Sequence, residues 1–224
     1  MTFSIVARCG ETGMFGIAIA SSSPAVASRC AWARAGVGAV ATQNVTDPTL
    51  GNRGLDLMAL GASAPQALGV IRETAPFIEY RQLALIDAQG RTALHSGGKA
   101  LGLFNAAEGK DCVAAGNMLA TDQVPAAMVA AFEAASGPLA ERLLAAMRAA
   151  LALGGEAGPI HSAGLKVVDT QNWPIVDLRI DWAEDGPIAL LEAAWVVYAP
   201  QIGAYVTRAL DPRDAPSYGV PGDL

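Results

Sequence analysis

A threonine stands at position 2, directly in front of an apolar run that begins at Phe3. Chain ends usually fray, but this run stays apolar, past one turn, through to Ala20, which predicts an anchored N-terminus. If Met1 is removed, Thr2 carries a free α-amine beside its own hydroxyl. Such a pair is one way in which enzymes make a nucleophile with its own base. Thr2 is therefore the first candidate catalytic residue.

A nucleophile of this kind needs a hydrogen-bond donor for the oxyanion that forms during the reaction. Asn117, in the segment GNML, follows a short expected strand and precedes an expected helix, so its side-chain amide is a candidate donor. A turn residue that caps the helix is the other interpretation of Asn117.

Candidate substrate-binding residues lie where two further expected strands end. Polar strand ends are also ordinary loop features, and a hydrogen-bonded histidine without a ligand role is the default interpretation of the one histidine among them. The candidates are Thr42, Gln43, Asn44, His95 and Ser96.

The sequence offers little for a cofactor, a metal ion or nucleic acid. Neither His95 nor His161 has another His or Cys at ligand spacing, so we expect no metal site. GVGAVA matches a dinucleotide fingerprint, but a strand continues where that motif needs a helix, so we expect no cofactor. The net charge of −6 and the lack of a basic stretch argue against a nucleic-acid partner. Arg8, Arg29 and Arg34 could pair with a substrate carboxylate if they converge.

The composition bears on assembly and compartment. Only 16% of the 224 residues are charged, against roughly 25% in an average soluble protein, and 52% are hydrophobic. We therefore expect a homo-oligomer, most simply a homodimer, in whose interface the run from Trp195 to Tyr198 takes part. The start lacks a signal-peptide pattern, no apolar run approaches 18 residues, and three separated cysteines indicate reduced thiols, so we expect a cytoplasmic protein without membrane contact.

Hydrophobic periodicity and turn signals predict the elements. We expect strands at residues 3–9, 14–22, 36–44, 112–115, 162–169 and 174–181, a hairpin at 81–97, and helices at 52–60, 64–74, 121–136, 137–155 and 187–198. Paired helices between groups of hairpin-connected strands favour an α+β fold over a parallel sheet. We predict one domain over residues 1–224, a four-layer αββα sandwich of two antiparallel sheets, with 3–9 and 14–22 at the centre of one sheet and a proline-rich tail from about residue 210.

Several segments together resemble a known family. They are, in order, MTFSIVAR, WARAGVGAVATQN, GNRGLDLM, GNML, PLAERLLAAM and VDLRID. They resemble a bacterial family known only as a conserved domain of unknown function, whose fold is that of the N-terminal nucleophile (Ntn) hydrolases. The resemblance covers about residues 1–192; it implies the αββα fold and no reaction.

Two departures from that family's pattern stand out. Asp181 is followed by Trp182 and Ala183, where members usually have a further Asp and a His. The loop before Ser162 reads GGEAGPIH rather than a run of charged residues. If those polar residues serve a site, this protein has lost part of it.

These features lead to one main hypothesis and two alternatives. The main one is an amidohydrolase for a small amide or peptide-like substrate, in which Thr2 Oγ attacks, the Thr2 amine is the base, and Asn117 or a backbone N–H stabilises the oxyanion. The alternatives are a non-catalytic protein of the same fold that binds a small peptide-like ligand, and a protein with an assembly role. We expect Thr2 to line the main pocket near Asn117 or residues 42–44, and Met1, where present, to block it.

Overall fold

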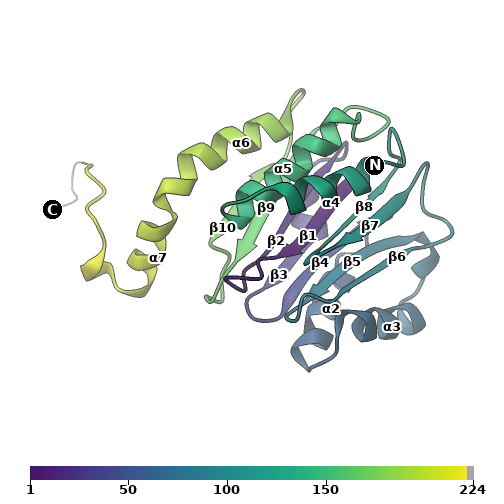
Figure 1. The fold of residues 1–224 in the computed structure, drawn as a ribbon, viewed down its shortest axis with the longest axis horizontal. Helices are drawn as coiled ribbons and strands as arrows, with labels where there is room; N and C mark the ends of the chain where they lie inside the picture. Colours follow the sequence, from purple (N-terminus) through teal and green to yellow (C-terminus); the bar gives the residue numbers. More distant parts are fainter. Residues whose placement is uncertain (221–224) are drawn as a thin grey trace.

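The structure, a computed structural model, describes residues 1–220, which form two antiparallel β-sheets (Figure 1). Sheet A has the strand order β10-β9-β2-β1-β8-β7 and sheet B the order β3-β4-β5-β6. The strands are β1 Thr2–Arg8, β2 Phe15–Ser21, β3 Ala31–Arg34, β4 Gly38–Asn44, β5 Arg81–Asp87, β6 Thr92–Ser96, β7 Asn105–Gly109, β8 Cys112–Asn117, β9 Ser162–Val168 and β10 Val176–Ile180.

Helices cover the outer faces of both sheets. The α-helices of the described residues are α1 Val26–Cys30, α2 Thr49–Ala59, α3 Ala64–Thr74, α4 Val124–Ala134, α5 Leu139–Ala152, α6 Pro187–Tyr198 and α7 Ile202–Leu210, and the buried residues of α1 lie between the sheets rather than on an outer face. Helices α4, α5 and α6 pack on sheet A, whereas α2 and α3 pack on sheet B (Figure 1). A separate apolar cluster, with Val6, Ile17 and Ile86 among its members, fills the space between the sheets. The layers therefore run helix, sheet, sheet, helix.

Strands β1 and β2 are the central pair of sheet A. Phe3 opposes Ala20 and Val6 opposes Ile17 in an antiparallel register, as the sequence predicts. Phe3 and Ile5 face the helices, while Val6 faces sheet B, and all three are fully buried. A strand that is buried on both faces needs apolar residues at successive positions, which explains the nearly continuous apolar run.

Some elements lie where the sequence predicts none, namely α1, β3, β7 and α7. Strand β7 has the sequence NAAEG, whose residues are poor strand formers, and it pairs along the free edge of β8, from Asn105 opposite Gly116 to Gly109 opposite Cys112. Helix α7 ends at Leu210, where the tail was expected to begin; Asp211 is extended, and a short 3-10 helix, Pro212–Asp214, follows. Residues 221–224 of the predicted tail lie outside the described residues.

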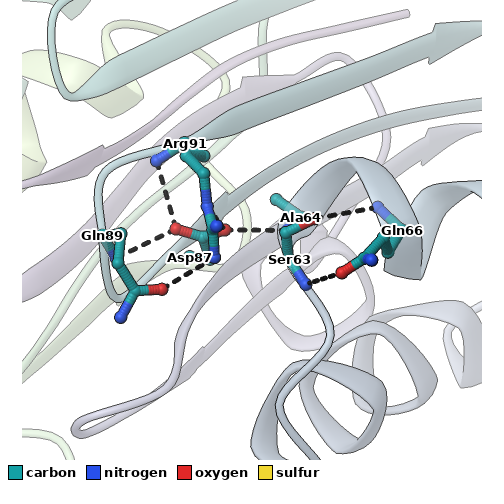
Figure 2. A network of polar contacts seen from close by, with 6 residues as sticks. All are labelled: Ser63, Ala64, Gln66, Asp87, Gln89 and Arg91. Atoms are coloured by element: carbon teal, nitrogen blue, oxygen red, sulfur yellow. Dashed lines mark hydrogen bonds and ion pairs between the residues drawn. The ribbon is translucent and has the colours of Figure 1, made fainter.

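Helix α3 begins as predicted, with Ser63 as its N-cap. The Ser63 hydroxyl accepts a hydrogen bond from the Gln66 N–H, and the Gln66 side chain accepts one from the Ser63 N–H at 2.9 Å, which makes a capping box (Figure 2). Two of the N–H groups that a helix leaves unpaired at its start are satisfied in this way.

Asp87, the last residue of β5, joins the β5–β6 turn to this helix. Its carboxylate accepts hydrogen bonds from the Ala64 N–H at 2.9 Å, from Arg91 Nε at 2.8 Å and from the N–H groups of Gln89 and Arg91 (Figure 2). Burial alone would raise the pKa of Asp87, but the bonds from Ala64, Arg91 and Gln89 outweigh it and lower that pKa. This buried charge is fully satisfied.

The predictions about the cysteines and about membrane-spanning segments can be compared with the described residues. The three cysteines are free thiols; Cys30 and Cys112 are buried and Cys9 is half-buried. Within residues 1–220, no helix has both the length and the apolar character that crossing a membrane would require.

Candidate functional site

A row of four polar side chains crosses the end of sheet A, one from each of the strands β9, β2, β1 and β8. Thr2 opposes Asn117, and Ser21 opposes Ser162, while the β1–β2 register brings Thr2 beside Ser21. Directly opposed residues in an antiparallel sheet point to the same face. That face is the one toward sheet B, because Val6 shares it with Thr2. Thr2 is 6% exposed and the other three side chains are fully buried.

Sheet B contributes a matching polar group at the same end. Gln43 opposes Gln82, and Gln82 opposes Ser96. Gln82 Oε1 accepts hydrogen bonds from Gln43 Nε2 at 2.8 Å and from Asn117 Nδ2 at 3.1 Å, so it joins the two sheets. Gln82 Nε2 donates to Ser96 Oγ and to the Gly116 carbonyl, both at 3.0 Å. Asn117, at one end of the polar row, is therefore bonded to sheet B through Gln82, a side chain that the sequence analysis missed.

The hydroxyl of Thr2 lies against the carbonyl of Met1. Thr2 Oγ1 and Ser21 Oγ both donate to the Met1 carbonyl oxygen, and the two hydroxyl oxygens are 3.2 Å apart. Ser21 Oγ is also 2.9 Å from Ser23 Oγ. The Met1 side chain packs against Gly158, where an added Cβ would come within 3.1 Å of Met1 Cε. An amide carbonyl thus sits beside the candidate nucleophile, and Met1 fills the space next to it.

Glu156 lies in the loop between α5 and β9 and was not predicted as a site residue. It is 3% exposed, and its Oε2 accepts a hydrogen bond from the Ser22 N–H at 3.1 Å. Burial raises the pKa of Glu156 to about 7, although the nearby terminal ammonium and the bonds from Ser22 act in the opposite direction. The signal in the sequence is a single acidic residue inside a glycine-rich loop between two apolar elements.

Two acceptor oxygens at this end lack a hydrogen-bond donor. They are Glu156 Oε1 and Asn117 Oδ1, both shielded from solvent. Among the described residues, only two further buried side-chain atoms lack a partner, Arg81 Nε and Gln171 Oε1. Because buried polar atoms are nearly always bonded in native proteins, each of these oxygens marks a place where a donor is missing.

Three of the predicted binding residues do not join this group. Thr42 and His95 point to the helix side of sheet B, where Thr42 Oγ1 donates to the Asp47 carbonyl and His95 Nε2 lies 3.0 Å from the Ile78 carbonyl. The reason is strand alternation, which sends Gln43 and Ser96 toward sheet A and their neighbours away from it. Asn44 has a left-handed backbone, with φ of 76°, and its side chain binds the Tyr80 carbonyl.

The expected main pocket lies elsewhere. A cavity of about 760 Å³ sits at the opposite end of β1, lined in part by Arg8, Cys9, Asp111 and Arg142. Thr2 does not line it, so the prediction that Thr2 borders the main pocket is corrected. Instead, Met1 and buried polar neighbours enclose Thr2.

The three N-terminal arginines do not converge. Arg8 pairs with Asp111 at 3.3 Å and Arg34 with Asp56 at 2.8 Å. Arg29 Nη2 donates to Ser23 Oγ at 2.9 Å, which places Arg29 alone of the three near the Thr2 end. Nowhere in residues 1–220 do three or more His, Cys, Asp or Glu side chains gather in a way that could hold a metal ion.

The comparisons with known proteins concern the whole of this arrangement. Residues 2–191 match the family model described as a family of unknown function, DUF1028. The chain belongs to the DUF1028 family. The crystal structure of protein SPO2555 from Silicibacter pomeroyi, assigned to the same family, is 30% identical, with a TM-score of 0.83 over 90% of this chain and 93% of that one.

A second solved structure was found as well. It is Anbu, the ancestral beta-subunit, from Yersinia bercovieri, which is 13% identical to this DUF1028 chain, with a TM-score of 0.40 over 91% of this chain and 97% of that one. The search among curated proteins gave no significant match.

Proposed function

We propose that this DUF1028 protein has the fold of the N-terminal nucleophile hydrolases and, once Met1 is removed, hydrolyses a small amide or peptide-like substrate. The observation that carries the proposal is the Met1 carbonyl held by the hydroxyls of Thr2 and Ser21. In the processed chain that place is free for the carbonyl of a substrate.

The residues of this site suggest the following steps. Thr2 Oγ gives its proton to the Thr2 α-amine and attacks the substrate carbonyl carbon, whose oxygen becomes an oxyanion. The oxyanion collapses, the C–N bond breaks, and the leaving amine takes the proton from the α-ammonium. Water, deprotonated by the same amine, then attacks the ester, releases the acid and restores Thr2.

Ser21 fits the role of oxyanion donor better than Asn117 does. Ser21 Oγ already donates to the carbonyl oxygen of Met1, whereas Asn117 Nδ2 donates to Gln82 and leaves an acceptor oxygen unpaired. We therefore assign the donor role to Ser21 and a positioning role to Asn117. Ser21→Ala should reduce kcat about 10²-fold, as loss of one oxyanion donor typically does.

The decisive experiment compares chains that differ at their first residue. A protease that leaves Thr2 as the first residue yields the processed protein, which is assayed on small acyl amides beside the Met1-containing chain. The processed protein should hydrolyse them, and Thr2→Ala, processed likewise, should lose about 10³-fold or more. Thr42→Ala is the matched control, because Thr42 is buried but bonded on the far face of sheet B. Equal rates from processed wild type and Thr2→Ala would leave the alternative, in which the protein binds a small ligand without turnover.

We also propose that the chain forms a homodimer through α6. Leu190, Val196 and Val197 are 47%, 72% and 66% exposed on this helix, and its one charged residue, Glu192, is paired with Arg148 of α5. A face without charge favours a partner surface like itself, as in a two-fold dimer. In Figure 1, α6 runs from the sheets out to α7.

Sedimentation at micromolar concentration tests the dimer. Wild type should sediment as a dimer and Val196→Asp with Val197→Asp as a monomer. The control is Leu60→Asp, on the other side of the molecule, where Leu60 is 87% exposed. A monomeric wild-type protein would contradict the proposal.

A further inference from the structure

The loop that carries Glu156 is fixed against the start of β1. The Ala120 N–H donates to the Gly155 carbonyl at 3.0 Å, and the Ala157 N–H donates to the Met118 carbonyl at 2.9 Å. Gly155 has a positive φ of 58° and packs against the ring of Phe3, where a Cβ would come within 3.1 Å. Hydrogen bonds on both sides of Glu156 thus hold its backbone in place beside the first residues of the chain.

The side chain of Glu156 is only half used in this position. One oxygen is bonded to the Ser22 N–H, whereas Oε1 is buried without a donor. Asn117, which opposes Thr2 across β1 and β8, has a second unpartnered acceptor, Oδ1. Two unpaired acceptors, one of them a carboxylate oxygen, suit a group with several N–H donors and a positive charge.

Removal of Met1 creates such a group at this place. In the Met1-containing chain the Thr2 nitrogen is an uncharged amide with a single N–H. After removal it is an ammonium with three N–H groups. We propose that Glu156 binds the α-ammonium of Thr2 in the processed protein and thereby sets its pKa and its orientation toward Thr2 Oγ. This rests on the proposed function, in which that amine is the base.

The charges around Glu156 agree with this assignment. In the Met1-containing chain, the Met1 ammonium is the charge that lowers the pKa of the Glu156 carboxyl, so the chain terminus lies within electrostatic reach of this carboxyl. Arg29, another cation of this end, instead donates to the Pro24 carbonyl and to Ser23 Oγ. An ammonium beside this carboxylate would hold it ionised, and the carboxylate would in turn raise the pKa of the amine. Glu156 would then decide the pH above which the amine can act as a base.

The test measures the α-amine itself, in protein processed to begin at Thr2. The pH dependence of its carbamylation by cyanate, followed by peptide mass spectrometry, gives its pKa. We expect Glu156→Gln to lower that pKa by about one to two pH units, and Glu156→Asp to lower it less. Glu73→Gln, on the exposed side of α3, is the matched control and should leave it unchanged. An unchanged pKa in a folded Glu156→Gln protein, or in Glu156→Asp if the first variant does not fold, overturns the inference.

The pH profile of hydrolysis gives a second readout. Loss of the carboxylate should move the acidic limb of kcat to lower pH by the same amount as the amine pKa. If Thr2→Ala and wild type hydrolyse equally while the amine pKa still moves, the proposed reaction fails and the binding of the amine by Glu156 stands. If hydrolysis depends on Thr2 but the amine pKa does not move, the assignment of Glu156 fails alone.

Discussion

Two carboxylates of this protein are both shielded from solvent, and their pKa values shift in opposite directions. Asp87 is 2% exposed and Glu156 is 3% exposed. Asp87 accepts four hydrogen bonds that use both of its oxygens, and its pKa is lowered despite burial (Figure 2). Glu156 accepts one backbone hydrogen bond, and burial raises its pKa to about 7.

The difference teaches that a carboxylate with donors on both oxygens keeps its charge and is structural, whereas a more deeply desolvated carboxylate with one free oxygen is available for chemistry. Asp87 joins a hairpin to a helix and has no capacity left for another group. Glu156 lies near Thr2 with one oxygen free, and a buried acceptor without a donor lowers stability unless something supplies one. The substitutions below test this contrast, from the largest expected effect to the smallest.

Gln82 makes hydrogen bonds to both sheets at the end where Thr2 lies. Gln82→Leu should therefore have the largest effect on stability. It removes the acceptor for Gln43 and Asn117 and leaves the Gly116 carbonyl without its side-chain donor. Several buried groups unpaired at once should lower the free energy of unfolding by about 4 kcal/mol. Urea unfolding measures it, with the exposed Gln123→Leu as control. A loss no greater than that of the control would mean that water replaces these bonds and that this end is open.

Asp87→Asn should be nearly as damaging. Asparagine has one acceptor oxygen and turns an N–H group toward the donors of Ala64 and Arg91, so we expect a loss of about 3 kcal/mol. Asp56→Asn, which breaks an exposed pair with Arg34, should change stability by about 0.5 kcal/mol or less.

The pH dependence of this loss has a definite sign. The pKa of Asp87 is lower in the folded state than its ordinary value of 3.8. Its stabilisation is therefore present above the unfolded pKa and disappears as pH falls through the folded pKa. Wild type and Asp87→Asn should thus converge in stability at strongly acid pH. A stability difference between the two proteins that stays constant down to the lowest pH would show that the charge of Asp87 does not stabilise the connection between the β5–β6 turn and α3.

Glu156→Gln in the Met1-containing chain should have the opposite sign to Asp87→Asn. Because the pKa of Glu156 rises from 4.5 to about 7 on folding, the folded state keeps a proton that the unfolded state has lost. Stability therefore falls as pH rises from 4.5 to 7, by roughly 3 kcal/mol at most. Glutamine resembles the protonated acid, so the variant should lack this fall and be the more stable protein at pH 8. Parallel stability curves for the two proteins would refute the contrast with Asp87.

Ser63→Ala should have the smallest effect of the set. It removes one side of the capping box while the bond from the Ala64 N–H to Asp87 remains, so we expect a loss of about 1 kcal/mol. Thermal unfolding measures it, beside Ser136→Ala at an exposed loop position. A loss as large as that of Asp87→Asn would mean that the cap and the carboxylate act as one unit.

Much of the fold could be predicted because its signals are local. Ser63, Pro65 and Gln66 predict the start of α3. Two alternating runs around a turn predict the hairpin of β5 and β6. The short elements could not be predicted in this way. Helix α1 has five residues and β7 has a weak strand sequence, so both depend on neighbours that are distant in the chain.

The candidate site divides along the same line. Thr2 and Asn117 could be singled out because their residue types and places in the chain are informative by themselves. Strand alternation predicts that Gln43 and Thr42 point to opposite faces of sheet B. Which face lies toward sheet A depends on the packing of the two sheets, and the structure shows that it is the face of Gln43. Gln82 sits inside an apolar strand, and nothing next to it in the sequence marks it as a bridge between sheets.

The sequence by itself determined the two-sheet α+β plan, the central β1–β2 hairpin, the family and the candidate nucleophile, because apolar periodicity and turn residues act over a few positions. The tertiary structure alone decided which polar groups meet. It brought Glu156 next to Ser22, 134 positions earlier in the chain, and Gln82 next to Asn117, 35 positions later. Such contacts depend on strand order and on which groups lose water, and neither property belongs to a local stretch of residues.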